Sequence, residues 1–74
     1  MQNKTFYFEW EDSPAVLMPT GKKTYFGYYI EDNNWETANA LQVGDFFDDG
    51  EMLNKGEFDK RFGGIGKKLP KIPG

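Results

Sequence analysis

Alternation of aromatic and polar residues predicts the first strand over residues 5–10. Phe6, Phe8 and Trp10 fall on one face of this segment, and the residues between them fall on the other. A strand with one large aromatic face packs that face into a core. These three rings are therefore expected to be buried, with Tyr7 facing outward.

A short apolar run at residues 15–18 predicts the second strand. The polar residues 11–14 before it form a turn. Pro19 cannot donate to a ladder, which places this end of the strand at an edge or a turn. Proline followed two positions later by Gly21 suits a tight turn, so the second and third strands are expected to pair as an antiparallel hairpin.

Residues 22–30 are predicted as the third strand, and they hold four of the thirteen aromatic residues. Phe26, Tyr28 and Ile30 alternate with Tyr25, Gly27 and Tyr29, so both faces of the strand are aromatic or apolar. Such a strand is either covered on both sides or shows an aromatic surface to a partner. The sequence leaves both alternatives open, and coverage of the second face by a helix or the tail is favoured.

Two interpretations compete for the segment that follows. In the first, Asn34 caps a helix that Gly44 closes. In the second, residues 41–43 enter a strand, with a bulge or turn at Gly44. The prediction combines them as a short helix over residues 35–41 and then a strand over residues 42–47.

A second helix is predicted near the C-terminus. Asn54 and Glu57 have the spacing of a capping box. Phe58 and Phe62 are four residues apart and would share one helix face. The glycine pair at residues 63–64 would end this helix.

These elements predict a β-dominated α+β fold, namely a small curved antiparallel sheet or partly open barrel of about four strands with one or two short helices. Residues 1–62 are expected to form a single small globular domain. Residues 63–74 contain glycines and prolines that neither a helix nor a central strand tolerates, so they predict an irregular arm, ordered only where Ile65, Leu69 or Ile72 find a groove. The expected core comprises Phe6, Phe8, Trp10, Phe26, Tyr28, Leu41, Val43 and Phe47.

The side-chain chemistry argues against catalysis. Histidine and cysteine are absent and Ser13 is the only serine, which removes the usual general base, the thiolate nucleophile and most zinc sites. We therefore predict a non-enzymatic protein with no catalytic residues, no cofactor and no metal. The acidic residues Asp45, Asp48, Asp49 and Glu51 are interpreted as a solvated turn rather than a cation site. No apolar run approaches the ~20 residues that span a bilayer, so no membrane contact and a cytoplasmic location are expected.

Charge is unevenly distributed along the chain. Residues 1–59 hold all twelve acids and four bases, whereas residues 60–74 hold five bases and no acid. An acidic body with a basic arm suggests a small acidic protein that docks on a larger protein partner as an inhibitor or adaptor, its arm becoming ordered as it wraps that partner. Tyrosines dominate interface energetics. The candidate binding residues are Tyr7, Tyr25, Tyr29, Lys67, Lys68, Leu69, Lys71 and Ile72.

Two alternative functions remain. Residues 23–30 resemble the aromatic strand of cold-shock and RNA-recognition domains, which implies a small β-barrel that stacks single-stranded nucleic acid on its rings. Lys22, Lys23 and the lysines of the arm would then contact phosphates. Thr24 stands where the motif has glycine, and the surrounding carboxylates oppose phosphate binding. The other alternative is a structural subunit of a viral or other assembly, a homo-oligomer associating through sheet edges.

Overall fold

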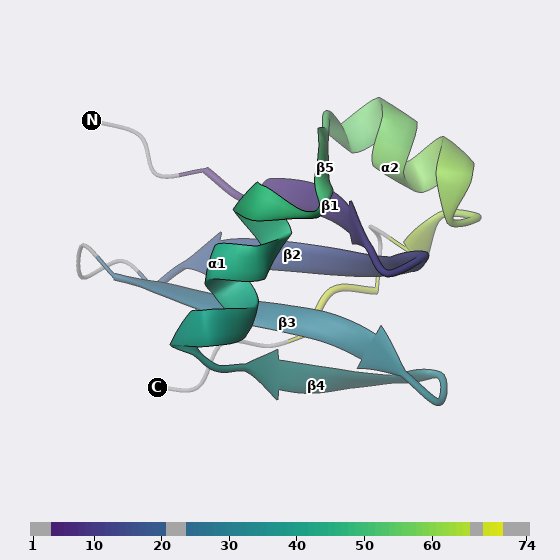
Figure 1. Ribbon diagram of the computed structural model, residues 1–74. Coiled ribbons are helices and arrows are strands. Elements are labelled where there is room, and N and C mark those ends of the chain that lie inside the picture. The colour runs from purple at the N-terminus through teal and green to yellow at the C-terminus, as the bar shows by residue number, and fades with distance from the viewer. Residues whose placement is uncertain (1–3, 21–23, 66–67, 71–74) are drawn as a thin grey trace.

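In the part of the chain that the structure describes, five antiparallel strands form one open sheet, and two short helices pack against it (Figure 1). The computed structural model describes residues 4–20, 24–65 and 68–70. The elements are β1 (Phe6–Trp10), β2 (Ser13–Pro19), β3 (Tyr25–Glu31), β4 (Asn34–Ala38), α1 (Ala40–Asp48), β5 (Glu51–Leu53) and α2 (Lys55–Arg61). The spatial order of the strands is β4-β3-β2-β1-β5. The predicted strand-dominated α+β fold is confirmed.

Two tight turns set the register of the hairpins. Glu11 and Asp12, between β1 and β2, have φ of 51° and 63°, and Asp32 and Asn33, between β3 and β4, have φ of 53° and 66°. Positive φ at both central residues matches the right-handed twist of antiparallel strands. The first turn is shorter than predicted, because Ser13 already belongs to β2.

The predicted β2–β3 hairpin is confirmed, and it places β2 at the centre of the sheet. Leu17 pairs with Gly27, and Met18 pairs with Phe26. Pro19 is the last residue of β2, where its missing N–H interrupts no ladder inside the strand.

The order of elements predicted for residues 35–47 is wrong, because the strand comes first and the helix second. Asn39, not Asn34, caps the helix, since its side chain accepts a hydrogen bond from the Gln42 backbone N–H at 2.9 Å. The Gln42 side chain in turn accepts from the Asn39 N–H at 2.9 Å. Asn34 instead opens β4 opposite Glu31.

Two small cores lie on the two faces of the sheet. Under α1, Phe46 packs against Phe8 and Trp10, with ring centroids 5.6 and 4.9 Å apart. Figure 1 shows α1 crossing this face. On the opposite face, the buried residues of the second core are Val16, Tyr28, Leu53 and Phe58. The middle of β3 is therefore covered on both faces, which is the alternative that the sequence favours.

Part of the expected core is wrong. Phe8, Trp10 and Tyr28 are buried, and Phe6 and Val43 pack partly against the first core. The exposed exceptions are Phe26, Leu41 and Phe47, at 41%, 83% and 50% exposure. Leu41 and Phe47 are exposed because residues 40–48 are helical, and the helical period turns Phe46 inward instead.

The second helix begins and ends as predicted. Asn54 and Glu57 form a reciprocal capping box, with hydrogen bonds of 2.8 and 3.1 Å. The rings of Phe58 and Phe62 lie 5.3 Å apart. Gly64 has a φ of 82° and donates its N–H to the Asp59 carbonyl at 2.7 Å, which closes the helix.

Candidate functional site

The three candidate tyrosines lie in different environments. Tyr25 is 39% exposed and contacts Phe6, with ring centroids 6.0 Å apart. Tyr29 is half-buried on the same face of the sheet, against Trp10 at 5.4 Å. Tyr7 lies on the opposite face, contrary to the outward orientation expected of it, because α2 covers that face and brings Phe58 within 4.9 Å. Of these three candidate tyrosines, only Tyr25 is exposed.

The candidate residues of the arm also differ in their exposure. Lys68 is exposed, and Leu69 packs partly against the second core, as does Ile65. The Trp35 indole Nε1–H donates to the Lys68 carbonyl at 2.8 Å. Lys67, Lys71 and Ile72 lie outside the described residues. The described part of the arm thus packs on its own sheet in the isolated chain.

Replacing Trp35 by phenylalanine is expected to loosen the contact between the arm and the sheet. The ring remains, but the Lys68 carbonyl loses its donor, and such a hydrogen bond stabilises by about 1 kcal/mol. Nuclear Overhauser effects between the Leu69 methyls and the second core should weaken, while those within the first core stay unchanged. Unaltered Leu69 contacts would contradict an anchoring role for this bond.

The Tyr7 phenol makes the free energy of unfolding depend on pH in the alkaline range. Burial raises the pKa of its phenol above the ordinary value of 10.0, and the nearby Asp59 carboxylate raises it further. Below pH 10 both the folded and unfolded forms keep the proton, so the free energy of unfolding is unaffected. Above it the unfolded chain releases its proton first, so stability is lost as the pH rises toward the folded pKa.

Urea denaturation between pH 8 and pH 11 measures this effect. We expect the wild type to lose more stability over that interval than Tyr7→Phe, which keeps the ring and lacks the titrating group. Identical pH profiles for the two proteins would show that Tyr7 does not carry the dependence.

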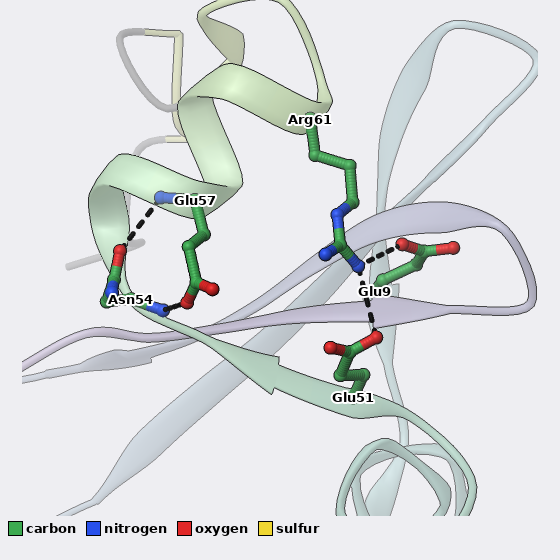
Figure 2. A network of polar contacts seen from close by, with 5 residues as sticks. All are labelled: Glu9, Glu51, Asn54, Glu57 and Arg61. Carbon is green, nitrogen blue, oxygen red and sulfur yellow. Dashed lines mark hydrogen bonds and ion pairs between the residues drawn. The ribbon is translucent and has the colours of Figure 1, made fainter.

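The acidic residues near the end of α1 do not form a cation site. Glu51 turns toward Arg61, whose Nη1 lies 3.1 Å from the Glu51 Oε1 and 2.7 Å from the Glu9 Oε1 (Figure 2). These hydrogen bonds, the one to Glu9 first, raise the pKa of Arg61. Asp45 and Asp48 stay on the exposed surface of α1. Among the described residues, no group of three carboxylates could hold a metal ion.

A larger feature is an apolar surface on the side of the sheet that α1 covers. Five large hydrophobic side chains are exposed in the described chain, and four of them lie here. Phe47 stacks edge-on against Phe8 at 5.0 Å, and Phe8 pairs with Met52 across β1 and β5. We define the α1-side apolar surface as Phe6, Tyr25, Leu41, Phe47 and Met52.

A shallow groove of about 390 Å³ meets this surface at Tyr25, between the start of β3 and the first half of α1. Its walls include Tyr25 and Val43, and Gly27 contributes no side chain. No carboxylate, lysine or arginine is among the residues that line it. The groove therefore offers apolar contact area and no acid–base pair for chemistry.

Sequence reasoning identified Tyr25 but assigned Leu41 and Phe47 to the core and did not select Met52. The signal for Leu41 and Phe47 was the Asn39–Gln42 spacing, which matches the Asn54–Glu57 box and fixes a helix from residue 40. No helix among the described residues is long and apolar enough to cross a bilayer. Comparison with models of known protein families, with curated proteins and with solved structures finds no significant match for this chain.

Proposed function

We propose that this protein is a non-enzymatic binding module that docks on a larger protein partner as an inhibitor or adaptor. The observation that carries the proposal is the α1-side apolar surface. Leu41, Phe47 and Met52 are each at least half exposed, at 83%, 50% and 53%. Exposed hydrophobic side chains gathered on one side of a small protein mark interaction sites, and aromatic rings contribute most to the energy of such contacts.

The chemical inventory supports binding rather than catalysis. The chain contains no histidine and no cysteine, and its single serine, Ser13, lies within β2. The groove beside α1 is open and its lining is mostly apolar, whereas a carboxyl group needs an enclosed site to become a general acid near neutral pH.

The docking surface lies on the folded body in this proposal. The described part of the arm is already packed, since Ile65 and Leu69 contact the second core and Trp35 binds the Lys68 carbonyl. Binding through Tyr25 and Phe47 needs no ordering of that segment, so it avoids the entropy loss that folding on a partner carries. Contacts from Lys67, Lys71 and Ile72 remain a prediction that adds to this surface.

Site-specific photo-crosslinking tests the proposal. A benzophenone amino acid is placed at Tyr25 or Phe47 of the full chain, produced in its native cell, with Thr37 as an exposed control on β4. We expect one larger protein to be crosslinked from Tyr25 and Phe47 and not from Thr37. The same protein trapped equally from Thr37, or no protein trapped at all, would remove the docking function.

A further inference from the structure

Helix α1 carries more apolar surface than its contact with the sheet uses. Its nine residues include three polar ones, Gln42, Asp45 and Asp48. Only Phe46 is fully buried, while Leu41 is 83% exposed and Phe47 keeps half of its surface exposed beside Phe8. Figure 1 shows α1 as the outermost layer on its face of the sheet. An amphipathic helix with one partner would be polar on this outer side.

Gly44, the central residue of α1, has no explanation within the described chain. A Cβ built at Gly27 would lie 2.6 Å from a Val43 methyl, and one at Gly50 would lie 2.5 Å from the Phe46 carbonyl oxygen. A Cβ at Gly44 would meet nothing within 4 Å, and its φ is not positive. Glycine lowers helix stability relative to alanine. A helix glycine in open space allows another backbone to approach closely.

The charges on α1 indicate the charge of the segment that would approach Gly44. Asp45 and Asp48 occupy its C-terminal half, Asp49 caps it, and its last turn holds no base. Carboxylates are unfavourable at the negative end of a helix dipole. A second copy of this chain would add the same carboxylates to the interface, where like charges repel. A segment with lysines or arginines would neutralise them.

We propose that the solvent-facing side of α1 binds a basic amphipathic helix of the partner. The partner helix crosses at Gly44, places apolar side chains on Leu41 and Phe47, and directs its bases to Asp45 and Asp48. This inference rests on the proposed docking function and specifies the chemistry of the partner. The contacts combine close backbone packing with charge complementarity, which together fix one docking register.

The decisive variant is Gly44→Gln, which places a longer side chain on the outer surface of α1 and favours helix. Gly56→Gln is its matched control, because Gly56 is an exposed glycine of α2. A Cβ built at Gly56 would lie 3.4 Å from the Asn54 Oδ1, which is ordinary contact. The probe is a synthetic leucine–lysine helix of about 18 residues, long enough to be helical. A leucine–glutamate peptide of the same pattern is the charge control.

The full-length wild type and Gly56→Gln should bind the lysine peptide equally, with amide shifts concentrated on α1. Gly44→Gln should bind at least about tenfold more weakly without a lower melting temperature. Combined Asp45→Asn and Asp48→Asn should weaken binding as well, and the glutamate peptide should not bind. Equal binding by Gly44→Gln, or equal binding of the glutamate peptide, would overturn the inference.

Two further results separate this inference from the proposed function. Crosslinking of a cellular partner from Tyr25 that persists in Gly44→Gln would keep the docking function and reject α1 as the helix-binding surface. A concentration-dependent dimer in sedimentation, unaffected by the lysine peptide, would assign this face of α1 to a second copy and overturn the basic helix.

Discussion

Replacement of Phe46 by alanine is expected to unfold most of the protein at 25 °C. Phe46 has no exposed surface, and its ring lies 5.6 Å from that of Phe8 and 4.9 Å from that of Trp10. It is the only fully buried residue that α1 contributes to the first core. Truncating a buried phenylalanine costs about 3–5 kcal/mol. Hydrophobic packing in a chain of this length rarely supplies more than about 3–5 kcal/mol of net stability.

Urea denaturation followed by far-ultraviolet circular dichroism measures the loss, and the adjacent Phe47→Ala is the matched control. Phe47 is half exposed and its ring contacts that of Phe8 from the side, at 5.0 Å. Its truncation should therefore cost about 1 kcal/mol, a fraction of the value for full burial. Equal losses at the two positions would show that the helix does not present Phe46 inward.

This pair of residues also shows where sequence reasoning reaches its limit. Alternation was sufficient for β1, because Phe8 lies two residues from both Phe6 and Trp10, a spacing that a helix would turn to its opposite face. The adjacent rings of Phe46 and Phe47 fit a strand and a helix equally well, so only the cap decides between them. Asn34 and Asn39 both favour a cap, and the one used is set by the turn at Asp32, which places Asn34 in β4.

The exposure of the candidate site residues was less predictable than the fold, because it depends on contacts between distant segments. Coverage of Tyr7 requires α2 to return to β1, and the arm is held by a hydrogen bond between Trp35 and Lys68, 33 residues apart. The exposure of Leu41 follows from which face of α1 packs on the sheet, since Phe46 takes the inward position. No local pattern encodes that choice, whereas the capping boxes that define both helices are local.

The close packing of α1 on the sheet requires a residue without a side chain at position 27, which is Gly27. Gly27→Ala would place its Cβ 2.6 Å from the Val43 Cγ2, 3.3 Å from the Ala38 Cβ and 3.5 Å from the Phe46 Cε2. Valine has one strongly preferred rotamer in a helix, so its methyl cannot swing away freely. We expect Gly27→Ala to lower the free energy of unfolding by about 1–3 kcal/mol.

Val43→Ala should rescue Gly27→Ala, because it removes the methyl group that the new Cβ meets. In a double-mutant cycle measured by urea denaturation, the pair should be more stable than the sum of the single changes predicts, by about 1 kcal/mol or more. Strict additivity would mean that α1 shifts away from β3 instead of clashing with it. Coupling between the two positions would show that α1 is held over Gly27, and with it the orientation that exposes Leu41 and Gly44 on the outer side of the helix.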